Sequence, residues 1–175
     1  MALRKIVTYP LPVLKQKAKP VTEFGEELEK LVADMAETMY DAPGVGLAAP
    51  QIGVPLQLAV IDITPKDEAN HLIVLVNPKI IKGEGEQTDE EGCLSVEEYS
   101  SKVTRFQKIW VEAQDIKGKP MEFEAEGFYA RVIQHELDHL NGKLFIDRIS
   151  SLKRSLYKKK IKKQLRAQQA EQTTK

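Results

Sequence analysis

The sequence contains a single cysteine, no apolar run of membrane-spanning length and no overall excess of either charge. The lone Cys93 excludes an intrachain disulfide and favours a reducing, cytoplasmic setting. No apolar run approaches the ~20 residues of a membrane span, and early prolines interrupt the N-terminus before it forms a secretory signal. Because 26 basic residues balance 26 acidic ones, the chain is neither a uniformly basic nucleic-acid binder nor an acidic disordered protein.

The remaining composition is that of an ordinary globular protein, 42% hydrophobic and 30% charged, with a length that suits one domain. The neutral total nevertheless hides an uneven distribution. Residues 1–150 carry 17 basic and 25 acidic side chains, whereas residues 151–175 carry nine basic and one acidic. We therefore expect an acidic body over residues 1–150 and a basic C-terminal helix or tail over residues 151–175.

Hydrophobic periodicity predicts an α+β fold with a largely antiparallel sheet. Prolines in the first 20 residues predict an extended arm, and the segment from Gly44 to Gly53 is interpreted as a structured loop. Apolar residues recur at helical spacing over residues 22–41 and 128–140, and a final helix begins near Ser150 or Ser151. Strands are predicted at residues 56–63, 71–76, 80–88, 109–114 and 121–126, the last two forming a hairpin.

The most informative string is His135-Glu136-Leu137-Asp138-His139, within the second predicted helix. Histidines at i and i+4 lie on one helical face, so both can ligate one metal ion. The intervening Glu136 can reach a water on that ion and act as general base. A helix with two surface histidines would show the same letters, but two of the chain's three histidines lie in this string.

A catalytic site of this type usually has three protein ligands and one open position. In the metzincin proteases the motif continues to a third histidine, but here Phe145 occupies that position. His71, the carboxylates and Cys93 remain as candidates. A lone cysteine is more often a small buried apolar residue than a ligand, although the neighbouring Gly92 permits close backbone approach.

Three separated motifs resemble those of the peptide deformylases: residues 44–51 (GVGLAAPQ), 91–95 (EGCLS) and 134–140 (QHELDHL). They occur in the family's order and at similar spacing, and the resemblance extends from about Leu3 to Ile149. It implies hydrolysis of the formyl group from N-terminal formylmethionine of newly made polypeptides, with release of formate. It also implies one divalent metal ion, usually Fe(II) with Zn, Ni or Co substituting, held by Cys93, His135 and His139.

The resemblance also implies roles for the residues around that metal. Glu136 would take a proton from water and later give it to the departing amine. The side-chain amide of Gln51 and the backbone N–H of Leu94 would face the oxygen on which negative charge develops. The residues that match family positions around the methionine slot and the substrate backbone are Val45, Gly46, Gly92, Phe128, Arg131 and Val132. Helical spacing explains Phe128 and Val132 equally well as core residues.

The sequence departs from the family's pattern after Leu94-Ser95, where many members continue with a hydrophobic residue and proline. Members also often place there an arginine that holds the substrate backbone, but this chain has Ser100 and Ser101, with Lys102 and Arg105 further on. An acidic residue can fix the tautomer of a ligating imidazole; Asp138, and less so Asp147, is a candidate for that role or for a structural one.

Residues 153–166 carry eight basic side chains and no acidic one, with a narrow apolar stripe of Tyr157, Ile161 and Leu165. One interpretation is a solvated terminal helix on the body. The other is an element that docks on an anionic surface such as RNA. In some deformylases a C-terminal helix binds the ribosome near the tunnel exit, so the resemblance makes the ribosome a candidate partner beside formyl-Met nascent peptides.

Two other functions fit parts of the pattern. A zincin-like metalloprotease needs a His or Glu third ligand, so a Cys93→Ser protein that retained metal would favour it. A non-catalytic binding module of deformylase-like fold predicts that Glu136→Ala changes nothing measurable. The intact ligand set and Glu136 favour the enzyme.

Overall fold

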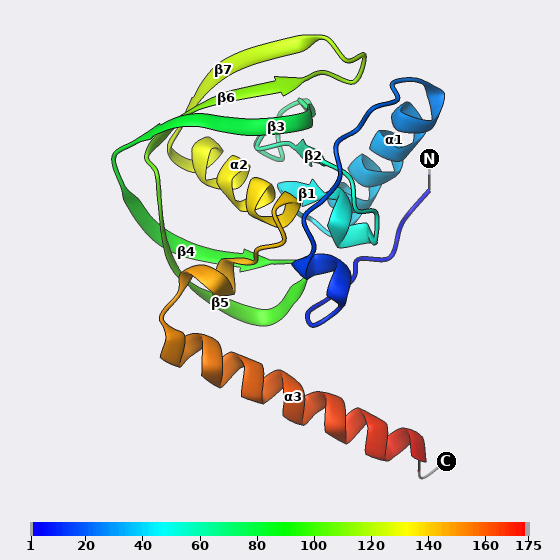
Figure 1. Cartoon of the computed structure of the whole chain (residues 1–175), viewed down its shortest axis with the longest axis vertical. Coiled ribbons are helices and arrows are strands. Elements are labelled where there is room, and N and C mark those ends of the chain that lie inside the picture. The colour runs from blue at the N-terminus through cyan, green and yellow to red at the C-terminus, as the bar shows by residue number, and fades with distance from the viewer. Residues whose placement is uncertain (1, 174–175) are drawn as a thin grey trace.

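The computed structural model describes residues 2–173 and has a mixed architecture of helices and antiparallel strands (Figure 1). Helix α2 (Gly127–Leu140) lies between a five-stranded sheet and a two-stranded sheet. Helix α1 (Glu26–Asp41) packs beside the short strands of the larger sheet, and α3 (Ser151–Thr173) lies at the edge of the molecule. This arrangement confirms the predicted α+β class.

The five-stranded sheet has the order β1-β2-β3-β6-β7, with every neighbouring pair antiparallel. Its strands are β1 (Gly46–Ala48), β2 (Leu58–Ile61), β3 (Ile73–Glu84), β6 (Lys108–Gln114) and β7 (Pro120–Glu126). The predicted hairpin is confirmed as β6 and β7. The two strands predicted at 71–76 and 80–88 are instead joined in β3, which passes Pro78 at an irregularity of its pairing with β6.

The two-stranded sheet, β4 (Gln87–Cys93) and β5 (Val96–Arg105), was not predicted beyond residue 88. The predicted loop at residues 44–53 likewise contains β1 and a 3₁₀ helix, Ala49–Ile52. In the second half of β5 the buried positions alternate as a strand requires, but they include Ser101 and Arg105. The sequence of β5 therefore lacks the alternation of apolar and polar residues from which a strand is predicted.

Helix α2 is held by apolar side chains that pack on the larger sheet, among them Ile133 and Leu137. It ends where Asn141 and Gly142 predict, and Gly142 has a φ of 74°. A Cβ there would lie 2.6 Å from the carbonyl oxygen of Lys15, so this turn requires glycine. Helix α1 begins at Glu26, four residues later than predicted, and ends at Asp41 as predicted.

The N-terminal arm and the first part of α3 both contact the region around β4 and β5. In the N-terminal arm, which includes a 3₁₀ turn at Pro12–Lys15, Val7 N–H donates to the Gln51 carbonyl and Tyr9 N–H to the Ser95 carbonyl. Helix α3 starts as predicted, with the Ser150 hydroxyl accepting from Lys153 N–H. Within residues 2–173, the helices are too short or too polar to cross a membrane.

Candidate metal centre

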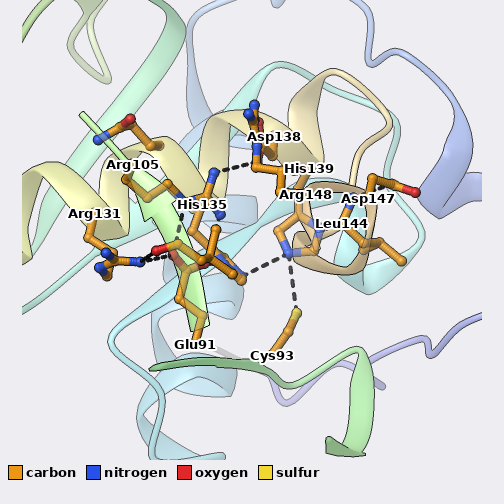
Figure 2. Close-up of polar contacts among 12 residues, drawn as sticks. Glu91, Cys93, Arg105, Arg131, His135, Asp138, His139, Leu144, Asp147 and Arg148 are labelled. Carbon is orange, nitrogen blue, oxygen red and sulfur yellow. Dashed lines mark hydrogen bonds and ion pairs between the residues drawn. The ribbon is translucent and has the colours of Figure 1, made fainter. Parts of the chain in front are cut away.

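Three potential metal ligands from two elements face one another inside the molecule (Figure 2). Cys93 ends β4, and His135 and His139 lie one turn apart on α2. Their ligand atoms all lie within 4.8 Å of one another. His139 Nε2 is 3.3 Å from both Cys93 Sγ and His135 Nε2. Among the three candidates for the third ligand, the structure thus brings Cys93 to the histidines, whereas His71 is exposed.

The chemistry of this cluster fits a cation. His135 Nδ1 lies 2.9 Å from a carboxylate oxygen of Glu91, which can only accept, so Nδ1 carries the proton and Nε2 presents its lone pair. The Cys93 sulfur accepts from the backbone N–H of Ser95 and from the side-chain amide of Gln51, two donors that suit a thiolate. Two imidazole nitrogens and a cysteine sulfur that converge in this way are typical of a divalent metal site.

The pKa values of the two histidines shift in opposite directions. Burial lowers the pKa of His135, but its hydrogen bonds with Cys93 and Glu91 outweigh burial and raise it well above its usual range. Burial and the charge of His135 hold the pKa of His139 well below its usual range. The cluster therefore attracts one positive charge, and a divalent ion competes with the proton for the same electron pairs.

A buried ionic network supports His135, and Glu91 is its centre. Glu91 accepts two hydrogen bonds from Arg105, at 2.7 and 2.8 Å, and one from Arg131. Burial opposes ionisation of Glu91, but the hydrogen bonds from Arg105 and His135 lower its pKa well below the usual range. Sequence reasoning missed this role, although Glu91 is the first residue of the EGCLS motif.

Of the two roles considered for Asp138, its contacts favour the structural one. It pairs with Arg105 and with Arg148, both at 2.6 Å, and no hydrogen bond between it and a histidine is found among residues 2–173. Arg105 in turn directs its donors to Glu91 and Asp138, so it is not free to hold a substrate backbone. Arg131 lines the cavity beside the cluster, but its guanidinium donates to Glu91, Gln87 and the Val103 carbonyl.

Glu136 lies beside the cluster with one oxygen unused. Its side chain is 3% exposed, and Oε2 has no hydrogen-bond partner within the described residues. Burial raises the pKa of Glu136 to about 7, despite the opposing charges of His135 and Arg105. A Cβ on Gly46 would lie 2.5 Å from Glu136 Oε1, so glycine at this position leaves room for the carboxylate. A carboxyl group of this kind can accept and return a proton near neutral pH.

Gln51 is fixed in the wall of the site. Its side chain is 1% exposed, and its Oε1 accepts from the backbone N–H of Ala48 at 3.0 Å. Its Nε2 donates to the Ser95 hydroxyl and faces the Cys93 sulfur at 3.6 Å. Leu94 lies in the turn that joins β4 to β5. Both residues line the cavity that opens beside the cluster.

That cavity has a volume of about 430 Å³ and contains all but one of the site residues singled out from the sequence, the exception being the deeper His139. Val45 and Phe128 stand at its mouth with 42% and 57% of their surface exposed, so core packing does not explain Phe128. Val132 is buried and lines the cavity as well. Gly46 and Gly92 lie on strands whose outer edges border this cavity, β1 and β4.

Comparisons with known proteins agree on one family. A family model described as polypeptide deformylase matches residues 3–155. The peptide deformylase of Desulfotalea psychrophila is 54% identical over 164 residues, which cover 93% of this chain and 97% of the relative. The crystal structure of a peptide deformylase from Legionella pneumophila has a TM-score of 0.86 at 51% identity, covering 95% of this chain and 98% of that one. Ehrlichia chaffeensis peptide deformylase, solved in complex with actinonin, has a TM-score of 0.87 at 36% identity, covering 94% of this chain and 98% of that one.

Proposed function

The chain belongs to the polypeptide deformylase family and removes the N-terminal formyl group of newly made polypeptides, and we propose that Cys93, His135 and His139 hold its metal ion. The observation that carries the proposal is the convergence of a thiol and two imidazole nitrogens within 4.8 Å, beside a buried carboxylate with a free oxygen. A divalent ion, when bound there, lowers the pKa of water and polarises the formyl oxygen.

Glu136 is the proposed proton carrier. Within residues 2–173 its Oε2 has no hydrogen-bond partner, and burial raises the pKa of the side chain, so the carboxylate can take a proton from water and hold it on an oxygen. The same oxygen then returns the proton to the amine as the formamide bond breaks and formate leaves. Gly46 supports this role because it leaves space for the Glu136 carboxylate to approach the cavity.

Gln51 and Leu94 are the proposed donors to the oxygen on which negative charge develops. The Gln51 amide is held by Ala48 N–H through its oxygen, so its NH₂ group stays turned toward Cys93. The Leu94 N–H belongs to the turn directly after Cys93. A single donor of this kind is typically worth ~3–4 kcal/mol of transition-state stabilisation.

The methionine side chain is proposed to enter the apolar part of the cavity, between Val45, Phe128 and Val132. Gly46 and Gly92 border that cavity from the outer edges of β1 and β4, where a substrate backbone can pair as an added strand. Arg131 borders the same cavity and supports the site by holding Glu91 in place.

Fe(II) is the proposed native metal, with Zn, Ni or Co as substitutes, because Fe(II) is the usual ion of this family. One cysteine and two imidazoles suit such borderline metals without selecting one. The test is to purify the protein without oxygen, measure its metal content, and assay formate release from formyl-Met-Ala-Ser. We expect about one divalent ion per chain and formate release. Absence of release with every divalent metal would defeat the proposal.

The basic segment 153–166 is proposed to dock the enzyme on the ribosome, in the cytoplasm, where formylated chains emerge. In this proposal residues 1–150 contain the catalytic site, and residues 151–175 contain the element that docks on the ribosome. Lys159, Lys163 and Arg166 are exposed on α3, so a triple charge reversal to Glu leaves buried contacts intact. We expect it to abolish co-sedimentation with ribosomes at low salt while formyl-Met-Ala-Ser hydrolysis persists. Unchanged co-sedimentation would reject docking through this segment.

A further inference from the structure

Helix α3 contacts the body mainly through Tyr157. Tyr157 is 3% exposed and is the only buried residue of α3, whereas the neighbouring Leu156 is 57% exposed. Ile161, one turn further on, packs partly buried against the same apolar cluster. The basic helix therefore meets the body near its start, and its later turns extend beyond the sheets (Figure 1).

The aromatic rings that contact Tyr157 come from two segments next to the proposed metal site. Its ring centroid is 4.8 Å from that of Tyr99 on β5 and 5.8 Å from that of Tyr9 in the N-terminal arm. The backbone N–H of Tyr9 donates to the Ser95 carbonyl at 2.8 Å, in the turn that follows Cys93. Tyr157 thus packs on the N-terminal arm and on β5, the two segments that flank the turn after Cys93.

A series of rings continues from Tyr157 toward the ligands. Tyr99 stacks on Phe145, with centroids 6.1 Å apart, and Phe145 stacks on His135 at 6.4 Å. Phe145 is 1% exposed, and Cys93 packs against the same cluster. Because protein interiors are closely packed, removing the Tyr157 ring should allow these neighbouring side chains to shift into the space that it leaves.

We propose that Tyr157 is a positioning residue for the metal site: by packing on Tyr9 and Tyr99, it fixes the turn that carries Cys93 and Leu94. This inference rests on the proposed ligand role of Cys93. Within residues 2–173 no hydrogen bond of the Tyr157 hydroxyl is found, so the ring carries the effect. The Tyr157 face of the basic helix then serves the site, and the exposed basic side chains of the same helix are free for docking.

The test compares Tyr157→Ala with Tyr157→Phe and with the exposed control Leu156→Ala, each loaded with Co(II). We expect Tyr157→Ala to release Co(II) to a chelator ~10-fold faster, the order seen when residues supporting a ligand are lost. Its thiolate-to-Co(II) absorption should change, and its kcat should fall with little change in KM, since the methionine slot lies apart from this cluster. Tyr157→Phe and Leu156→Ala should stay within about twofold of the parent in every measurement.

Two results would overturn the inference. One is a Tyr157→Ala protein with a lower melting temperature but unchanged Co(II) release, spectrum and kcat, which would make Tyr157 only a stabilising residue. The other is a Tyr157→Phe protein as impaired as Tyr157→Ala. If Tyr157→Ala does not fold, Tyr157→Leu carries the same comparison with a smaller acceleration. Failure of the proposed function is distinct, because the parent itself would then lack the thiolate-to-Co(II) band or release no formate.

Discussion

The proposed metal centre draws its ligands from two regions that are built differently, helix α2 and the β4–β5 hairpin. In α2, helical spacing alone brings His135 and His139 to one face, and buried apolar residues hold the helix on the sheet. The hairpin carries few apolar residues. Its position depends on polar bonds to distant parts of the chain and on the aromatic cluster around Tyr157.

Glu91 joins the two regions, because it lies on the hairpin and bonds to His135 of α2. Removing one partner from a buried ion pair typically costs ~3–5 kcal/mol. That is a large share of the ~5–15 kcal/mol by which a domain is stable. The hairpin is therefore a region in which one polar substitution should disturb the metal site. Glu136 of α2 makes no ion pair with this network within the described residues, so an isosteric change there should leave the ligands in place.

The strongest test of the α2 side is Glu136→Gln, which keeps the shape of the side chain and removes its ability to carry a proton. We expect turnover of formyl-Met-Ala-Ser to fall by ~10²–10⁴-fold. Metal content should match that of the parent protein, because Glu136 is not a proposed ligand. Retained turnover would show that another group carries the proton.

Crowding of the same carboxylate should have a smaller effect. In Gly46→Ala the new Cβ would lie 2.5 Å from Glu136 Oε1, so the carboxylate must move. A displacement of this size can lower turnover by ~10²-fold. Gly25→Ala is the matched control, since an added Cβ there meets nothing within 4 Å. Equal turnover of the two variants in a steady-state assay would contradict the proposed position of Glu136.

On the hairpin side, Glu91→Gln removes the charge that holds Arg105, Arg131 and His135 together. We expect the affinity for Ni(II), measured by competition with a chelator, to fall by ~10–100-fold. Asp89→Asn changes an exposed carboxylate of the same strand and should leave the affinity unchanged. If Glu91→Gln lowers only the melting temperature, Glu91 holds the hairpin without positioning His135.

The sequence predicts the parts of the fold that have local periodicity. Helix α2 and the β6–β7 hairpin follow their apolar patterns closely, because each buries one face on the core. The β4–β5 hairpin was missed because its inward positions include Arg105 and Ser101, which are buried through polar contacts with other elements. The hydrophobic pattern of a short segment cannot predict contacts of this kind.

In the proposed site, too, local spacing could be predicted from the sequence, whereas contacts between distant residues could not. The spacing of His135 and His139 predicted two of the proposed ligands directly, whereas Cys93 was selected from several candidates only through the family resemblance. The support given to His135 by Glu91 was missed, because the two residues are 44 positions apart and meet only in the fold. The same holds for Tyr157, whose helical stripe is visible in the sequence but whose contacts with Tyr9 and Tyr99 are not.

X-ray absorption spectroscopy of the Zn(II)-loaded protein tests the central claim most directly. One ion per chain should show one sulfur ligand at ~2.3 Å and two imidazole nitrogens at ~2.0–2.1 Å. The sulfur contribution should disappear in Cys93→Ser. A Zn(II) spectrum without sulfur in the parent protein, or an unchanged spectrum in Cys93→Ser, would contradict the proposed ligand set.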